Sequence, residues 1–348
     1  MMVEAADRLG IECTVLARSG DESVARSGRA PTIRTVDHFD ATTLAALARD
    51  VDVITFDHEP VDLAAVSEAA ERGATLRPGP EALAFSDKAH QRCALALAGI
   101  AVPPFVVTED PDDIDRFGDQ HGWPIVVKAP IGGYDGRGVI AAPDPRTAIE
   151  AFERFDRRAL LAPLLPLRAE LSVVTVRTID GEVAAYPAFD TVQDQGMCRE
   201  VTVPSLLPDP ILRDAAAIAS RVAAVVGSVG VLAIELFVVG DDVLVNEVSP
   251  RPHNSGHLTI EACATSQFEN HLRAVLGWPL GSTALVVPAA AMVNVVGLDT
   301  GHPIVSAAAG ATVHDYRKSP RPGRKLGHVT VVADDLATAI ESVRSTIR

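Results

Sequence analysis

Two acidic side chains interrupt neighbouring apolar runs, and their spacing could build a metal site. Glu235 lies inside the apolar run at 231–239, and Glu247 follows the run at 243–245. An acid inside an apolar run is rarely left unpaired, so a surface position of Glu235 on an amphipathic strand is the weaker alternative. Carboxylate oxygens from two adjacent strands suit Mg²⁺, and Mn²⁺ accepts the same ligands. The pair therefore predicts a magnesium site.

A polar loop follows Glu247 directly, with the sequence VNEVSPRPHNSGH at 245–257. Its prolines and glycine exclude a regular helix. The loop offers donors that suit a small planar anion such as a carboxylate or bicarbonate, namely Asn254, His253 and His257 beside Arg251. A histidine–metal site is less favoured, because His253 and His257 do not share a helical face and no third soft ligand stands nearby.

A glycine-rich segment, GGYDGRG at 132–138, lies between apolar runs at 123–128 and 139–142. This position predicts a hairpin loop, since a Rossmann or P-loop turn would lead into a helix. Glycine N–H groups can close on phosphate oxygens, and Lys128 would add a positive charge to the same phosphates. A flexible turn beside a stray lysine is the alternative. Two acids follow this segment later in the chain, however. A lysine, a glycine-rich hairpin and then two acids is the order expected for a site that binds a nucleoside triphosphate through magnesium.

Further candidates are spread along the chain. Glu170, at the start of an apolar strand, could accept hydrogen bonds from ribose hydroxyls, or it could be an edge-strand acid facing water. Lys88 stands at a predicted helix start and could reach a phosphate, although most lysines are solvated. A basic cluster near the C-terminus, which contains Lys318, Arg324 and Lys325, suits a phosphate monoester, with a solvated loop as the alternative.

Composition excludes several classes of function. The formal net charge of −15 would repel a nucleic-acid backbone. The four cysteines are far apart and form no CxxC pair, which argues against zinc and fits a reducing, cytoplasmic setting. No apolar run is long enough to cross a membrane, and the N-terminus does not resemble a signal peptide. We therefore expect neither nucleic acid nor membrane as a partner.

The length of 348 residues predicts two or three domains. Residues 1–80 alternate expected strands and helices, which indicates a small α/β domain with a parallel sheet. The expected strands are 11–16, 51–56 and 74–76, and the expected helices are 1–10, 40–48 and 61–72. Such a domain should open with a strand and a glycine turn, whereas this chain opens inside the first helix, so we expect an N-terminally incomplete domain.

Residues 81–285 form the expected middle domain, with a glycine-hairpin subdomain at about 119–190. The expected strands there are 123–128, 139–142, 160–165, 170–177, 183–189, 231–239 and 243–247. The expected helices are 145–155, the alanine-rich 209–226 and one that begins at about Thr259. Residues 286–348 form an expected C-terminal domain, rich in strands and ending in a helix from Leu336.

Together these features resemble the ATP-grasp superfamily and, within it, the 5-(carboxyamino)imidazole ribonucleotide synthases of purine biosynthesis. The segments that carry the resemblance are 132–138, ELS at 170–172, NEVSPRPHNSGH at 246–257, TIEACATSQF at 259–268 and RPGRKLGH at 321–328. The resemblance implies a mixed α/β and α+β architecture. It would comprise an N-terminal Rossmann-like (pre-ATP-grasp) domain lacking its first strand, an ATP-grasp domain and a small C-terminal β-rich domain.

The resemblance also implies a ligase reaction. ATP would phosphorylate bicarbonate to carboxyphosphate, which would carboxylate 5-aminoimidazole ribonucleotide at its amino group with release of ADP and phosphate. A homodimer is implied as well.

The resemblance assigns a role to each candidate residue. Phosphates of ATP would be held by Lys88, Lys128, Gly132, Gly133, Tyr134, Gly136 and Gly138, the ribose by Glu170, and magnesium by Glu235 and Glu247. Arg251, His253 and Asn254 would position bicarbonate, Tyr134 and Asp135 would face the reacting amine with Asp135 as its base, and Glu59, Lys318, Arg324 and Lys325 would bind the ribonucleotide.

The chain departs from the family pattern at three positions. The family's Glu-x-Glu pair is Asp57-His-Glu59 here. Ala162 replaces an acid before Pro163, so the backbone would still meet adenine while a side-chain contact to its amino group is lost. The family's Tyr-Gly-Lys is Tyr316-Arg-Lys318.

Two other functions remain open from the sequence. A formate-dependent ATP-grasp enzyme similar to glycinamide ribonucleotide transformylase would share the Pro-Arg-Pro-His stretch, although the Asn254-Ser-Gly-His257 continuation fits it less well. A nucleotide-binding protein without turnover would follow if the first strand of residues 1–80 were lost.

Overall fold

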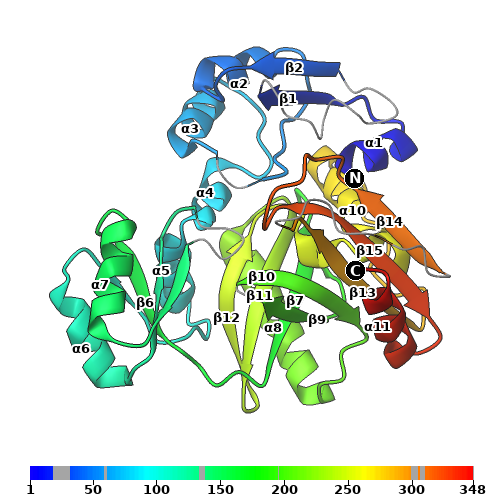
Figure 1. Ribbon diagram of the computed structural model, residues 1–348. Helices are drawn as coiled ribbons and strands as arrows, with labels where there is room; N and C mark the ends of the chain where they lie inside the picture. The colour runs from blue at the N-terminus through cyan, green and yellow to red at the C-terminus, as the bar shows by residue number, and fades with distance from the viewer. Residues whose placement is uncertain are drawn as a thin grey trace.

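A computed structural model describes residues 1–18, 32–58, 61–132, 138–194, 196–298, 305 and 310–347. In Figure 1 the first residues form a layer of helices and short strands above a large sheet, and a smaller subdomain lies to one side. The expected combination of α/β and α+β parts is therefore present. No helix within the described ranges is long and apolar enough to cross a membrane.

The first layer contains two short parallel pairings. Its elements are α1 (Met2–Leu9), β1 (Thr14–Arg18), β2 (Thr32–Val36), α2 (Ala41–Leu47) and α3 (Leu63–Glu71). Strand β1 pairs with β2, and Ile54 forms an isolated parallel bridge with Leu76. The strand expected at 51–56 is thus reduced to one bridging residue, because a strand needs a continuous hydrogen-bonding neighbour. Strand β2 was not expected, since its largely exposed Thr-Ile-Arg-Thr-Val sequence contains no apolar run.

Local sequence signals explain the helices of this layer. Asp40 accepts a hydrogen bond from Thr43 N at 2.8 Å and caps α2. Asp62 caps α3 in the same way, with 2.9 Å to Ala64 N. A connecting region follows, built from α4 (Pro80–Leu83), η1 (Ala84–Ser86) and α5 (Lys88–Leu97). Asp87 caps α5 through Ala89 N at 2.7 Å, and this cap fixes Lys88 in the first turn.

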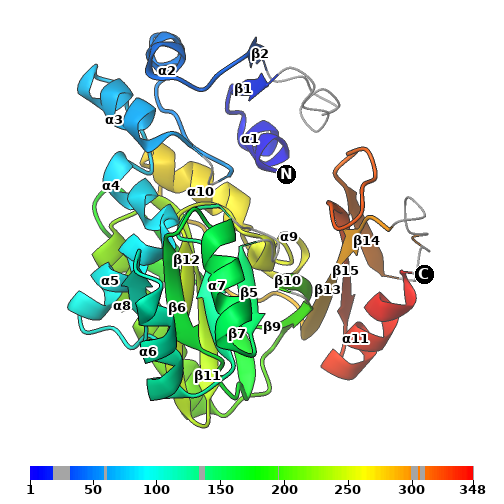
Figure 2. The ribbon, with the colours of Figure 1, turned by 60° about the vertical axis from the view of Figure 1, so that its left-hand side comes forward.

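The side subdomain contains the glycine-rich segment. Its four-stranded sheet has the order β3-β6-β4-β5, and α6 and α7 cover it (Figure 2). The bounds are β3 (Val106–Thr108), α6 (Asp112–His121), β4 (Ile125–Lys128), β5 (Val139–Ala142), α7 (Pro145–Arg154) and β6 (Ala159–Pro163). Antiparallel pairing of Lys128 with Val139 confirms that β4 and β5 are the two strands of a hairpin.

A nine-stranded sheet forms the body of the molecule, with the order β12-β11-β7-β9-β10-β13-β15-β14 and β8 beside β7. Helix α8 packs on one face of its first strands, whereas α9 and α10 pack on the other face. The bounds are β7 (Ala169–Arg177), β8 (Val183–Ala185), β9 (Phe189–Asp194), β10 (Met197–Val203), α8 (Asp209–Val226), β11 (Gly230–Val239), β12 (Asp242–Ser249), η2 (Asn254–Gly256), α9 (Thr259–Ala262) and α10 (Gln267–Leu276).

Two expectations for this sheet were wrong in detail. The single strand expected at 183–189 is two strands, β8 and β9, because Pro187 between them cannot donate to a ladder. The helix expected from Thr259 ends at Ala262 and resumes at Gln267, where Ser266 begins a new helix by accepting from Glu269 N at 3.2 Å. Strand β10 was not expected.

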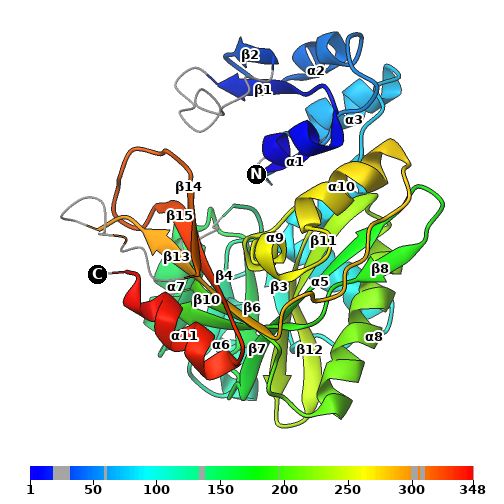
Figure 3. The same cartoon turned by 90° about the vertical axis from the view of Figure 1, so that its right-hand side faces the viewer.

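The last residues complete the same sheet instead of forming a separate one. They are β13 (Ala289–Val296), β14 (Ala311–Asp315), β15 (Lys325–Ala333) and α11 (Leu336–Ser345). Strand β13 pairs with β10, and α11 covers β13 and β15 through Ala339 and Val343 (Figure 3). The domain bounds at 80 and 285 stay predictions. The large sheet, however, contains strands from both sides of residue 285.

Candidate active site

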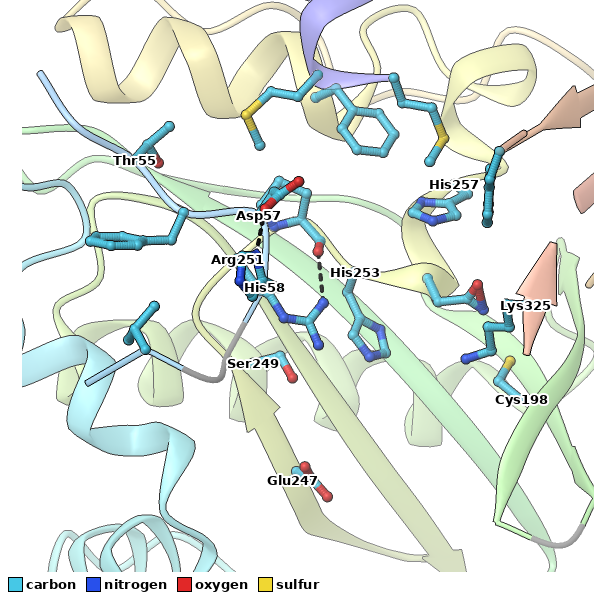
Figure 4. A pocket seen from close by; sticks show the side chains of 18 of the residues that line it. Thr55, Asp57, His58, Cys198, Glu247, Ser249, Arg251, His253, His257 and Lys325 are labelled. Carbon is cyan, nitrogen blue, oxygen red and sulfur yellow. Dashed lines mark hydrogen bonds and ion pairs between the residues drawn. The ribbon is translucent and has the colours of Figure 1, made fainter. Parts of the chain in front are cut away.

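One cavity of about 1810 Å³ lies between the first layer, the hairpin subdomain and the large sheet. Most of the described candidate residues line it. They are Lys88, Lys128, Glu170, Glu235, Glu247, Arg251, His253, Asn254, Lys318, Arg324 and Lys325. Figure 4 shows part of this lining, with Glu247, Arg251, His253 and Lys325 around one space. Folding therefore collects residues that are spread over more than two hundred positions of the chain.

The two acids lie side by side on neighbouring strands, of which β12 is the edge strand of the large sheet. Strands β11 and β12 are antiparallel, and Glu235 is the register partner of Glu247. Burial, then the neighbouring charges of Glu247 and Glu170, raise the pKa of Glu235 to about 7. Burial also acts on Glu247, but the charge of Lys88 and its hydrogen bond outweigh it and lower the pKa of Glu247. A cation between the carboxylates would relieve this repulsion, so the pair fits a metal.

Lysines approach these acids from two other elements. Lys88, at the start of α5, forms an ion pair with Glu247. Lys128, at the end of β4, donates to Asn246 Oδ1 at 2.8 Å and lies 5.9 Å from the Phe237 ring centroid. Burial, followed by the charge of Arg92, lowers the pKa of Lys128 to about 8. Both ammonium groups are therefore held where phosphates next to a metal at the acids would lie.

Arg92 is a residue of this site that the sequence analysis missed. It is 2% exposed, lines the cavity and donates from Nη2 to the Asn246 carbonyl at 2.9 Å. Burial lowers its pKa to about 10, which leaves it charged at neutral pH. The spacing of Lys88 and Arg92 was a usable sequence signal for Arg92, because residues four apart share a helix face.

The polar loop after β12 holds a neutral histidine beside an acid. His253 Nδ1 accepts from Ser255 N at 3.3 Å, so the proton of the neutral ring is on Nε2, which lies 3.7 Å from Glu235 Oε1. Burial, and then the charges of Arg251 and Lys325, lower the pKa of His253 well below its usual range. Arg251 donates from Nη1 to the Pro252 carbonyl at 3.0 Å.

Asn254 completes this donor set. Its Nδ2 atom is buried and makes no regular hydrogen bond within the described part of the chain, although the Cys198 thiol lies close enough for the Asn254 side chain to lower its pKa. A buried amide donor without a partner is costly unless a ligand accepts from it. The loop thus presents a guanidinium, an imidazole and an amide to the cavity, which is a donor set for a small oxyanion.

Gln267 fixes the shape of this loop and was also missed. It is fully buried at the start of α10. Its Oε1 accepts from His253 N at 2.9 Å, and its Nε2 donates to the His253 carbonyl at 2.7 Å and lies 3.0 Å from His257 Nδ1. The sequence carries no signal for this role, because glutamine at a helix start is common.

The C-terminal basic residues reach the cavity around β15. Lys325 begins that strand, and Arg324 Nη1 donates to the Ser319 carbonyl at 3.0 Å. Lys318 Nζ lies 5.3 Å from the centroid of the Tyr316 ring, whose hydroxyl is 2.8 Å from His328 Nδ1. The expected basic cluster therefore forms part of the cavity wall rather than a separate solvated loop.

Some candidates are not placed at the cavity. Glu59, Gly133, Tyr134, Asp135 and Gly136 lie outside the described residues. Gly132 and Gly138, at the base of the hairpin, are described but do not line the cavity. The roles expected for these seven residues stay predictions.

Two further residues line the cavity without having been predicted as site residues, although Asp57 was noted as a departure from the family pattern. Asp57 accepts from His58 Nδ1 at 2.7 Å and lies near Arg251 (Figure 4). Cys198 lies near Lys325, and burial raises the pKa of its thiol to about 12, so the thiol stays protonated at neutral pH.

Histidine, cysteine and acidic side chains do not gather in threes as a metal cluster anywhere in the described ranges. A magnesium ion at Glu235 and Glu247 would therefore take its remaining oxygen ligands from phosphate and water, as this ion commonly does.

Family models match three successive parts of the chain. Residues 1–87 match a ribonucleotide synthetase preATP-grasp domain, residues 93–268 an ATP-grasp domain, and residues 290–342 a phosphoribosylaminoimidazole carboxylase C-terminal domain.

Known proteins are similar over nearly the whole chain. An N5-carboxyaminoimidazole ribonucleotide synthase from Mycobacterium tuberculosis is 42% identical, over 98% of this chain and 82% of that protein. A crystal structure of carboxyaminoimidazole ribonucleotide synthase from Aspergillus clavatus complexed with ATP has a TM-score of 0.91 and 30% identity, over 99% of this chain and 94% of that one. A second structure from the same organism, in complex with ADP and 5-aminoimidazole ribonucleotide, has a TM-score of 0.88 and 30% identity, with the same coverage.

Proposed function

This chain belongs to the N5-carboxyaminoimidazole ribonucleotide synthases, ATP-grasp ligases of purine biosynthesis, and from that premise we propose how its own residues bind the substrates and divide the reaction. The overall reaction is the ATP-dependent carboxylation of 5-aminoimidazole ribonucleotide. The proposal adds bicarbonate as the carbon source, magnesium as the metal and a role for each cavity residue.

The triphosphate of ATP binds at the acid and lysine end of the cavity. Lys88, Lys128 and the glycine hairpin hold the phosphates, and Glu170 accepts from the ribose hydroxyls. The position of Glu170 on β7 beside Phe237 of β11 supports this role, because it faces the same space as Lys128. Glu235 and Glu247 bind Mg²⁺, which, when bound, neutralises charge on the β- and γ-phosphates. Lys88 then exchanges its ion pair with Glu247 for a phosphate oxygen.

Bicarbonate binds beside these groups, in the polar loop. One of its oxygens attacks the γ-phosphorus, the bond from that phosphorus to the β-phosphate oxygen breaks, and ADP leaves. Arg251, the Nε2–H of His253 and Asn254 Nδ2 hold the bicarbonate and stabilise the carboxyphosphate that forms. A neutral His253 suits this role, because it donates a hydrogen bond without adding a second charge to Arg251.

The ribonucleotide binds between the first layer and the C-terminal strands. Lys318, Arg324 and Lys325 hold its phosphate, and Glu59 is a further residue that contacts it. Its amine attacks the carbonyl carbon of carboxyphosphate, the C–O bond to phosphate breaks, and phosphate leaves. The amine loses one proton in this step, and Asp135 accepts it, with Tyr134 beside the amine.

The observation that carries this proposal is the register pair of Glu235 and Glu247. It lies beside Lys88 and Lys128 on one side and beside Arg251, His253 and Asn254 on the other. A phosphorylated anion could thus form and be stabilised within a single cavity that also reaches a phosphate-binding basic cluster.

ADP release measured in bicarbonate-depleted buffer tests the proposal. We expect little ADP without added bicarbonate, a slow bicarbonate-dependent release, and a strong increase when 5-aminoimidazole ribonucleotide is added. Formate in place of bicarbonate, with glycinamide ribonucleotide, tests the transformylase-like alternative in the same assay. Turnover that needs formate, or no response to bicarbonate with the ribonucleotide present, would overturn the proposal.

The assembly and location are part of the same proposal. We expect a homodimer, which light scattering after size exclusion measures directly. A cytoplasmic location is supported by the cysteines, since Cys13, Cys93, Cys198 and Cys263 are all free thiols. Cell fractionation would test it.

A further inference from the structure

His271, in the middle of α10, connects the first layer of the molecule to the strand that carries Glu235. Its ring is fully buried. Its Nδ1 accepts a hydrogen bond from Val231 N, the second residue of β11, at 3.0 Å. Its Nε2 lies 2.7 Å from Thr55 Oγ1. The three partners are far apart in sequence, so only the fold brings them into line.

The protonation state of this ring follows from its partners. Burial lowers the pKa of His271 to about 4, so the ring is neutral at pH 7. Because Nδ1 accepts from a backbone N–H, the one ring proton must be on Nε2. Nε2 therefore donates to the Thr55 hydroxyl oxygen. Both ring nitrogens are satisfied, and the direction of each hydrogen bond is fixed.

The backbone at Gly230 makes this arrangement possible. Its φ is +104°, and a Cβ added there would lie 2.7 Å from His271 Nδ1. Only glycine lets β11 begin this close to the ring. Two other contacts hold the first layer on the same helix, since Ala5 and Ala6 of α1 pack on Phe268 and Leu272 (Figure 3).

Thr55 belongs to the segment of the first layer that faces the cavity. Thr55 and Asp57 both line the cavity, whereas His271 does not. In Figure 4 Asp57 lies above Arg251, and Thr55 lies on the same segment. The described part of this segment ends at His58. The next residue in the sequence is Glu59, for which a ribonucleotide contact is proposed above. A hydrogen bond at Thr55 therefore sets the position of this wall relative to β11.

We propose that His271 and Thr55 form a positioning pair that holds segment 54–58 against β11 and thereby shapes the ribonucleotide side of the cavity. The pair touches no reacting atom. The ATP side is built from α5, β4, β7, β11 and β12, so its geometry does not depend on Thr55. This inference rests on the proposed function, because it assigns the ribonucleotide to this wall.

Steady-state kinetics of Thr55→Val and Thr55→Ser test the pair. Valine keeps the shape of threonine but removes the acceptor, whereas serine keeps the acceptor and removes a methyl group. We expect Thr55→Val to raise KM for 5-aminoimidazole ribonucleotide roughly tenfold, the equivalent of about 1.4 kcal/mol, with KM for ATP unchanged. Thr55→Ser should stay within about twofold of the wild type.

A double-mutant comparison adds a second readout. If the two residues act through one hydrogen bond, His271→Gln combined with Thr55→Val should raise KM for the ribonucleotide no more than His271→Gln alone. Equal KM values for wild type and Thr55→Val would overturn the inference, and so would a parallel rise in KM for ATP. If the wild type itself showed no ribonucleotide-dependent ADP release, the proposed function would fail instead, which keeps the two failures distinct.

Discussion

Lys128 reaches the cavity from the end of β4 with almost all of its side chain buried. At 8% exposure its charge is poorly solvated, and its pKa is lowered to about 8 by that burial and by Arg92. Its proton is therefore retained below pH 8 and lost above it in the ligand-free enzyme. Because ATP phosphates favour the charged form, nucleotide binding should depend on this proton.

We predict that kcat/KM for ATP falls as the pH rises above about 8, approaching a tenfold loss per pH unit. The value of kcat/KM reports the free enzyme, in which the lowered pKa applies. In Lys128→Met this alkaline fall should disappear, and the remaining activity should be low at every pH. A wild-type profile that stays flat to pH 9.5 would contradict the charge role of Lys128.

Glu247 is the acid whose charge the site stabilises, since Lys88 lowers its pKa. Glu247→Gln keeps the shape but removes the charge needed for a metal. We expect ADP release to fall by at least about a hundredfold, because coordination and phosphate alignment are lost together. Thermal unfolding should shift to lower temperature, because the buried ion pair between Lys88 and Glu247 is lost and the relief of repulsion with Glu235 offsets this only in part. Near-normal turnover at saturating Mg²⁺ would refute the metal assignment.

Arg324 belongs to the group expected to hold the ribonucleotide phosphate. Arg324→Ala should raise KM for the ribonucleotide about tenfold or more, while kcat changes little, because a phosphate contact is made equally in the ground and transition states. Arg317→Ala is a matched control at a neighbouring lining residue with no proposed phosphate contact. A loss confined to kcat would argue against a binding role for Arg324.

At the scale of elements, hairpins and helix starts deliver the functional groups. The β11–β12 hairpin places Glu235 opposite Glu247, and the cap at Asp87 places Lys88 in the first turn of α5. The polar loop has little regular structure of its own, and the start of α10 holds it through Gln267. The loop's shape is thus set by a different element from the strand that delivers it.

Gln267→Ala should destabilise the protein and misplace the loop together. Removal of the amide leaves the buried N–H and C=O of His253 without partners, so we expect the free energy of unfolding to fall by about 2–3 kcal/mol. The factor by which kcat falls should exceed the factor by which KM for ATP rises, because the polar loop is displaced and the phosphate site is not. Urea unfolding and ADP release measure the two effects.

Arg273→Gln on the same helix is the control. It breaks an ion pair with Glu269 at 2.9 Å that is partly exposed, and such pairs contribute roughly 0.5 kcal/mol. Its kinetics should match the wild type. Similar kinetic losses in both variants would mean that α10 acts only through general stability.

At the scale of the whole molecule, the cavity exists because three parts of the chain close on one sheet. The first layer docks on α10, where Arg77 Nη1 also donates to the Val275 carbonyl at 2.5 Å. The C-terminal strands extend the sheet, and α11 is tied back to it by Arg344, whose Nε and Nη2 donate to Glu200 at 2.7 and 3.0 Å. These junctions bury charged and titratable groups.

Several histidines at or near these junctions are buried in the neutral form, which makes the fold sensitive to acid. For His271 the native pKa is about 4 and the ordinary value is 6.5. Between these values the unfolded state binds more protons than the native state, so stability is lost as the pH falls from about 6.5 toward 4. The cost from this one residue reaches about 3 kcal/mol.

We therefore predict that the free energy of unfolding falls steadily between pH 6.5 and 4.5 in urea titrations. The His271→Gln variant lacks the imidazole and cannot take up this proton. The slope of its unfolding free energy against pH should therefore be smaller than that of the wild type, by an amount that corresponds to nearly one proton. Subtracting one slope from the other cancels the contribution of the carboxylates, because these titrate in both proteins. Identical slopes would show that His271 is not buried in its neutral form in solution.

Patterns among near neighbours in the sequence were enough to predict many of the helices and strands and the chemistry available to them. Apolar runs with single acids marked the strands of Glu235 and Glu247, the cap at Asp40 marked α2, and the alanine-rich run at 209–226 marked α8. These features depend on periodicity and capping between near neighbours, which a sequence displays directly. The family resemblance rested on the same local segments.

Contacts between residues that are distant in the sequence became visible only in the folded chain. Arg92 at Asn246, Gln267 beneath the polar loop and His271 beneath Thr55 are ordinary helical residues in the sequence. The continuation of the large sheet into β13–β15, and the reduction of 51–56 to one bridge at Ile54, are likewise invisible locally. Each depends on which surfaces pack together, and that choice is set by burial of the whole chain rather than by the pattern of any one segment.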